Sequence, residues 1–134
     1  MNRLIILFVG IGVWILSTLP VSADVSLQQL ITIIGKKATT IRGDGKGNVV
    51  LIKASNVTLK NLNIEHGSLN RSSDEEYSGI RTMGEHNQFI NLVIHDVYHG
   101  LYINSSKHTL VKNVKVTGQG TGKLGSQGNG IQLV

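Results

Sequence analysis

The strongest constraint on the fold is a short internal repeat. Three nine-residue segments, which start at Asn56, His86 and His108, share one pattern. Each has an apolar residue at its fourth position, an asparagine at its sixth, and apolar residues at its seventh and ninth. The offsets between these starts are 30 (56 to 86) and 22 (86 to 108) residues. A second motif alternates with the first, at residues 49–52, 79–82, 100–103 and 130–133. Such a period is typical of a solenoid.

The apolar residues of both motifs alternate with period two over very short runs, which indicates strands. Strands this short bury an apolar face only when they stack. A turn of about 22 residues with three short strands predicts an all-β fold, a right-handed parallel β-helix of about four coils, with a possible short capping helix at Ser26–Leu30. A leucine-rich-repeat solenoid is the rival, but its longer consensus is absent. The expected inner walls are Val50, Ile52, Ile80, Thr82, Leu101, Ile103, Ile131 and Leu133; Leu59, Phe89 and Val111; and Leu62, Ile64, Leu92, Ile94, Val114 and Val116.

The repeated asparagines Asn61, Asn91 and Asn113 fall between two strands of each coil. Such a corner needs a left-handed residue, and asparagine tolerates that conformation better than most residues. Stacked asparagines can also form a hydrogen-bonded ladder. We therefore expect a structural role for them and no catalytic one.

The N-terminus has the form of an export signal. Asn2 and Arg3 precede an apolar run over residues 4–16, and Val21-Ser22-Ala23 follows with the small residues of a cleavage site. A cleaved signal peptide over residues 1–23 is expected, and a periplasmic or other extracytoplasmic location with it. A membrane anchor is the alternative, but the run is short for a span of about 20 residues and Pro20 interrupts it. We expect residues 24–35 to form an N-terminal cap and the first strand. Residues 36–134 are expected to form the β-helix repeats, which are incomplete at the C-terminus.

Composition excludes several classes of site. The chain has no cysteine, so it holds no disulfide, thiolate metal site or cysteine nucleophile. The net charge of +5 is spread along the chain without a basic run, so no nucleic-acid binding is expected. Longer turns become loops at residues 67–78, which include the acidic residues 74–76, and at residues 118–129. Gly43–Gly47 is interpreted as a turn, because it lacks the phosphate-loop spacing.

Several runs together resemble one family. They are residues 40–48, residues 57–64, Ser78-Gly79-Ile80, residues 100–103 and Gly128-Asn129-Gly130-Ile131. They are similar to the NosD family, periplasmic accessory proteins of nitrous oxide reductase, within the pectate-lyase-like β-helix group. The resemblance implies an exported protein that works beside an ABC transporter and supports assembly of the copper site of the reductase. Membrane contact is then expected only through the transporter.

This chain departs from that family in two places. An extra coil before residues 31–35 is absent, and the chain stops at Val134 inside a strand, whereas family members continue for many more coils. The sequence therefore indicates a truncated chain, and an inert fragment with no activity of its own is a further interpretation.

Five histidines are the main candidates for chemistry: His66, His86, His95, His99 and His108. Residues 95–99 contain the densest cluster. In the repeat register His86 and His108 occupy equivalent turns, so their rings are expected to stack one rung apart, about 4.8 Å. Met83 lies three residues before His86, and imidazole with thioether suits copper, including Cu(I). We expect copper as the ligand of these six residues, while solvated turn histidines are the plainer interpretation.

An enzyme is not expected. β-Helix lyases, hydrolases and epimerases place carboxylates, or a base with arginine or lysine, on the outer face of the first strand. The corresponding residues here are Leu51, Arg81, Tyr102 and Gln132, without a carboxylate. Arg81 and Tyr102 could still bind a sugar, so a carbohydrate-binding or carbohydrate-active β-helix is the alternative function.

Overall fold

The computed structural model describes residues 12–16, 25–27, 31–36, 39–70, 77–118 and 127–134. In these residues the chain forms eleven strands: β1 (Gly12–Leu16), β2 (Val25–Leu27), β3 (Ile31–Gly35), β4 (Thr40–Arg42), β5 (Val50–Ile52), β6 (Thr58–Glu65), β7 (Ser78–Thr82), β8 (Gln88–His95), β9 (His99–Ile103), β10 (Leu110–Thr117) and β11 (Ile131–Leu133). The cleavage position expected at Ala23 and the acidic residues 74–76 lie outside the described residues.

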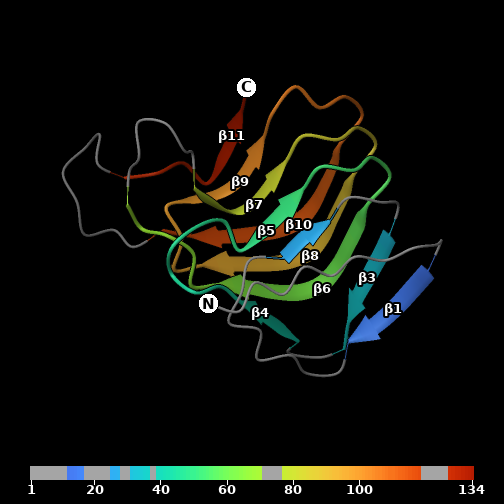
Figure 1. The fold of residues 1–134 in the computed structure, drawn as a ribbon, viewed down its shortest axis with the longest axis horizontal. Helices are drawn as coiled ribbons and strands as arrows, with labels where there is room; N and C mark the ends of the chain where they lie inside the picture. The colour runs from blue at the N-terminus through green and yellow to red at the C-terminus, as the bar shows by residue number, and fades with distance from the viewer. Residues whose placement is uncertain (1–11, 17–24, 28–30, 37–38, 71–76, 119–126) are drawn as a thin grey trace.

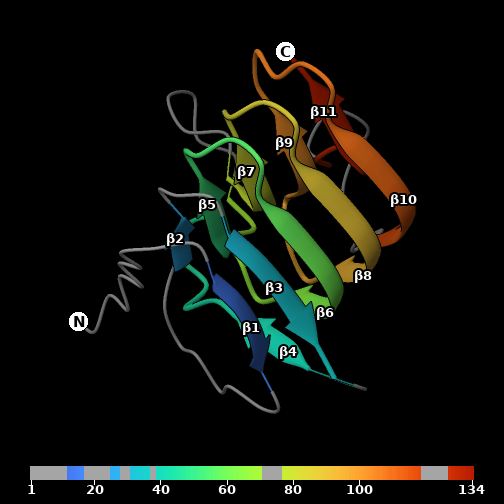
Figure 2. The same ribbon diagram turned by 90° about the vertical axis from the view of Figure 1, so that its right-hand side faces the viewer.

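The strands stack as two parallel sheets. One sheet has the order β1-β3-β6-β8-β10, with β4 beside the second half of β6, and the other has the order β11-β9-β7-β5-β2. Figure 1 shows the two stacks facing each other, and Figure 2 shows β3, β6, β8 and β10 as successive rungs of one wall. The coils make a parallel β-helix of about three turns, with further strands at each end. The predicted all-β parallel β-helix is thus confirmed, although with fewer complete turns than the four expected.

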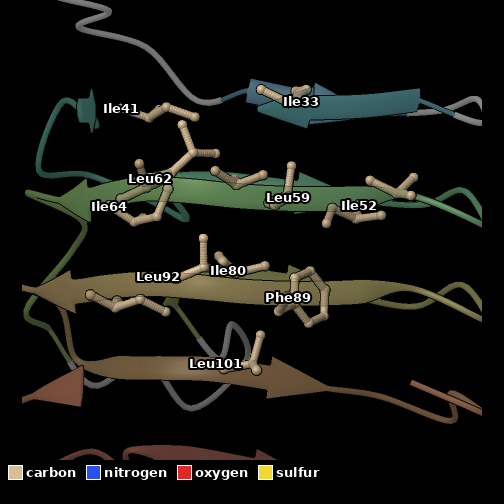
Figure 3. Close-up of a cluster of buried hydrophobic side chains, with 14 of the residues drawn as sticks. Ile33, Ile41, Ile52, Leu59, Leu62, Ile64, Ile80, Phe89, Leu92 and Leu101 are labelled. Atoms are coloured by element: carbon tan, nitrogen blue, oxygen red, sulfur yellow. The ribbon is translucent and has the colours of Figure 1, made fainter. Parts of the chain in front are cut away.

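The inward residues of both motifs fill the space between the sheets as expected. The coil has two walls and not the three expected, because the second and third expected walls join in continuous strands such as β6. Leu59 and Phe89 lie in one register column, and Ile64 and Ile94 in another. All four are fully buried, and Figure 3 shows Leu59 and Phe89 on successive rungs of the stack. Parallel pairing places equivalent residues of successive coils about 4.8 Å apart, so each apolar side chain packs on its own repeat.

One detail of the sequence-based prediction is wrong, and a second part of the predicted wall differs in burial. A capping helix was expected from Ser26, but the described residues contain no helix, and Val25–Leu27 is strand β2, parallel to β5. Residues 28–30 lie outside the described part. Ile131 and Leu133 share register columns with the buried residues Leu101 and Ile103, as expected for the inner wall, but they are 47% and 71% exposed. No described strand covers β11 on its far side, so the wall is open there.

The apolar stretch expected in the signal peptide contributes a strand to this structure. Gly12–Leu16 pairs in parallel with all five residues of β3. Among the described residues, no helix is long and apolar enough to cross a membrane.

Candidate functional site

Left-handed backbone at the corners of the coil decides where the polar side chains lie. Besides Gly45, positive φ angles occur at Asn56, Asn61, His66, His86, Asn91, Asp96, Ser105, His108 and Asn113. Most of these residues fall into three columns, in which equivalent corners of successive coils lie above one another. Asparagine, aspartate and histidine are the non-glycine residues that tolerate this conformation best. His66, His86 and His108 lie at such corners, and His95 lies beside the corner residue Asp96. The left-handed backbone is therefore a structural reason for these residue types, besides any chemical one.

The asparagine column is the simplest of the three. Its φ angles are 58°, 53° and 54° at Asn61, Asn91 and Asn113. The amide of Asn91 donates to Oδ1 of Asn61 at 3.1 Å, and the amide of Asn113 donates to Oδ1 of Asn91 at 3.1 Å. The three side chains form a ladder that ties three coils together.

A second column, which we call the imidazole column, consists of His86 and His108. Their rings stack with centroids 4.8 Å apart and planes 16° from parallel. The backbone holds them in place, because the N–H of His86 donates to the carbonyl of Lys107 at 2.9 Å. Met83 ends the strand region before this turn, and its side chain is exposed.

The imidazole column rests on a buried asparagine that sequence reasoning missed. Asn87 is fully buried next to His86. Its Oδ1 accepts the N–H of Val57 at 2.8 Å, and its amide donates to Oγ1 of Thr82 at 2.8 Å and to the carbonyl of Gly84 at 3.1 Å. Bonds on this many sides fix the turn that carries His86. No sequence signal indicated the role of Asn87, because polar residues are common at turns.

The third column belongs to a charged cluster at another corner, which we call the carboxylate corner: Arg42, Glu65, His66, His95 and Asp96. Oε1 of Glu65 accepts a hydrogen bond from Arg42 at 2.7 Å, and Nε2 of His95 lies 3.1 Å from Oε2 of Glu65. Nδ1 of His66 lies 2.9 Å from Oδ2 of Asp96. The sequence order Glu-His on one coil and His-Asp on the next thus pairs each imidazole with a carboxylate across the rung.

His99 has a different environment from the other histidines. It is buried at the start of β9, and its Nδ1 accepts the backbone N–H of Asn129 at 2.9 Å. Its ring also contacts Tyr98 edge-on, with centroids 4.6 Å apart. His95 is in contrast half exposed and bonded to Glu65. The two residues of the densest sequence cluster therefore have different partners.

The two residues considered for carbohydrate binding do come together. The guanidinium carbon of Arg81 lies 5.3 Å from the ring centroid of Tyr102, and the two residues are register neighbours on β7 and β9. Tyr102 is only 7% exposed, however. A ring that is buried under an arginine offers little open face for stacking on a sugar.

The candidate copper ligands lie at several separate places in the structure. No group of three or more histidine, cysteine, aspartate or glutamate side chains within the described ranges could hold a metal ion. Of the six residues considered for copper, the structure brings His86 and His108 into contact and gives His66, His95 and His99 protein partners. No protein-family model, curated protein or solved structure matches the chain.

Proposed function

We propose that the chain is an exported, non-enzymatic β-helix protein that handles copper during assembly of the copper site of nitrous oxide reductase, with an ABC transporter as its partner. The observation that carries the copper part is the stacked pair His86 and His108, which lie at left-handed corners of adjacent coils with their rings 4.8 Å apart. The signal-like N-terminus and the sequence resemblance support the setting.

The chemistry of the imidazole column suits a metal that is passed on. Imidazole nitrogens are good copper ligands, and a thioether favours Cu(I). Met83 begins the turn that ends in His86, and its side chain is exposed. Two imidazoles and one thioether are few ligands, so the metal would stay accessible to a partner. Copper is then cargo, and no step of catalysis is assigned to this chain.

The carboxylate corner provides a matched control. His66 and His95 also lie on adjacent coils, but each is already bonded to a carboxylate. Copper binding there would have to break those contacts. The carboxylate corner therefore offers the same number of histidines on adjacent coils with a weaker expected affinity for copper.

The test is a Cu(I) titration against a chromogenic chelator, using the chain recovered from an exporting host. We expect one Cu(I) per chain, with affinity lowered at least tenfold in the His86→Asn/His108→Asn double variant. Asparagine keeps the left-handed corner. The His66→Asn/His95→Asn variant should bind as the parent does. A folded chain that takes up no Cu(I), or whose uptake is equal in both double variants, contradicts the proposal.

The carbohydrate-binding alternative makes a separate prediction. If it holds, uronate polymers bind and Arg81→Ala abolishes the binding. Because Tyr102 is buried, we expect no measurable binding in the parent chain.

A further inference from the structure

The outer face of the sheet that contains β6, β8 and β10 is exposed and basic. Figure 2 shows these strands as successive rungs of one wall. The residues that alternate with the inward ones point away from the core, and three of them are lysines: Lys60, Lys112 and Lys115. Glu65 is the one carboxylate of these three strands, and it already pairs with Arg42. The positive charge of the lysines is therefore not offset within the strands that carry them.

Apolar side chains lie between the lysines. Ile90 stands between Lys60 and Lys112 in one register column, so the two lysines are two rungs, about 9.6 Å, apart along the stack. Val93 is one rung from Lys115 in another column. The stacking of coils thus places aliphatic and basic side chains next to each other on one surface.

This combination is typical of a protein surface that rests on a membrane. Val93 and Leu110 are 37% and 44% exposed, so they can enter the boundary between headgroups and acyl chains. Lysine ammonium groups can reach the surrounding phosphates while their alkyl stems stay on the apolar surface. We propose that this face, which we call the lysine face, binds the surface of a membrane that contains anionic phospholipid. Its residues are Lys60, Ile90, Val93, Leu110, Lys112 and Lys115.

The composition of the lysine face favours lipid over a protein partner. The cores of protein interfaces are enriched in aromatic residues and arginine and depleted in lysine. The outward residues of β6, β8 and β10 include three lysines but no phenylalanine, tyrosine, tryptophan or arginine. An anionic bilayer requires no such anchors, because each basic residue near its surface raises the affinity roughly fivefold.

The opposite wall does not share this pattern in its described residues. The outward residues of β5, β7 and β9 include Leu51, Arg81 and Tyr102, which form one register column. Arg81 lies against the ring of Tyr102, which is only 7% exposed. The two walls therefore give the molecule an orientation, with the lysine face toward the lipid and the β5-β7-β9 wall away from it. This contact is direct, and it is additional to any contact made through a transporter.

Vesicle co-sedimentation tests the proposal with the chain recovered from an exporting host. We expect binding to vesicles made of equal parts phosphatidylglycerol and phosphatidylcholine to be at least tenfold tighter than binding to phosphatidylcholine alone. Lys112→Gln/Lys115→Gln should weaken binding to the mixed vesicles at least tenfold. The matched control Lys46→Gln/Lys53→Gln removes the same charge from exposed sites outside the lysine face and should bind as the parent does.

A second pair of variants tests the apolar part of the contact. Leu110→Ser should weaken binding to the mixed vesicles at least threefold, because binding at the interface scales with the apolar area that enters it. Leu69→Ser is the matched control, since Leu69 is 46% exposed and lies outside the lysine face. It should bind as the parent does.

Equal binding to the two kinds of vesicle, or equal loss in the two lysine variants, would overturn the proposal. So would polyglutamate or polygalacturonate that binds as tightly as the vesicles and ignores Leu110→Ser, because the occupant would then be an acidic protein or polysaccharide. If circular dichroism shows that Lys112→Gln/Lys115→Gln does not fold, the two single variants decide, and unchanged binding in both contradicts the proposal. No copper is added, so the result is independent of the Cu(I) titration.

Discussion

The imidazole column and the carboxylate corner both place two histidines on adjacent coils, but only the carboxylate corner places a carboxylate beside each ring. At the carboxylate corner each ring meets a carboxylate of the next coil, at 2.9 Å for His66 and 3.1 Å for His95. In the imidazole column His86 and His108 meet only each other's faces in the contacts described. The residue one rung away therefore decides whether a corner histidine is tied into the fold or left with its nitrogens available to a ligand.

The largest expected loss of stability is in the asparagine column, which serves as the reference for the two histidine sites. Asn91→Ala removes two hydrogen bonds of the ladder. It also places alanine, which tolerates the left-handed conformation less well than asparagine, at a φ of 53°. We expect a loss of about 2–3 kcal/mol in the free energy of unfolding, measured by urea denaturation, from the bonds and the left-handed strain together.

Asn91→Gly is the control, because glycine accepts the left-handed conformation but cannot rebuild the ladder. Its loss should be about half that of the alanine variant. Equal losses in the two variants would show that the backbone conformation contributes nothing, and the explanation of the three corner columns would be wrong.

The next largest effect should come from the carboxylate corner. Glu65 is bonded to both Arg42 and His95, and its side chain is 21% exposed. Glu65→Gln keeps the size of the side chain but removes the charge that both partners share. We expect a loss of about 1 kcal/mol in the free energy of unfolding, at the upper end for exposed pairs, since Arg42 and His95 are half exposed.

A double-mutant cycle of Glu65→Gln with His95→Asn isolates that contact. The coupling should be about 0.5 kcal/mol, with the rest of the Glu65→Gln loss assigned to Arg42. A coupling energy indistinguishable from zero would mean that the contact between Glu65 and His95 is not formed in solution.

The repeat was sufficient to predict the fold, because the inward residues of each coil are apolar and their register follows from the spacing alone. The expected one-rung stacking of His86 on His108 came from the same register. The partners of His66 and His95 were not predicted, although Glu65 and Asp96 are their neighbours in sequence. Pairing across the rung depends on which way each corner turns its side chain, and a left-handed φ changes that direction locally.

The ends were the least predictable part. Ile131 and Leu133 have the same sequence pattern as Leu101 and Ile103, yet the first pair is exposed and the second is buried. Pattern indicates which face of a strand is apolar, but burial depends on whether another coil follows. Val25–Leu27 likewise became a strand because β5 offered an edge to pair with, which outweighed its local preference.

A smaller effect is expected for the imidazole column itself. His86→Asn/His108→Asn removes the ring stack but keeps residues that favour the left-handed corner. The free energy of unfolding should therefore change by less than about 0.5 kcal/mol, as is usual for exposed positions without a bonded partner. A loss comparable with that of Asn91→Ala would make the stack a structural element and would remove the distinction drawn between the two corners.

The smallest effect is the response to salt, and it separates the corners most directly. The contact of Glu65 with Arg42 is between charged groups near the surface, so it weakens as the Debye length falls from about 10 Å at 0.1 M salt to about 3 Å at 1 M. The destabilisation caused by Glu65→Gln should shrink by a few tenths of a kcal/mol over that range. The destabilisation caused by His86→Asn/His108→Asn should not change, because ring stacking does not depend on an opposite charge. Urea denaturation at both salt concentrations measures both quantities. If the two variants respond to salt equally, charge does not distinguish the carboxylate corner from the imidazole column.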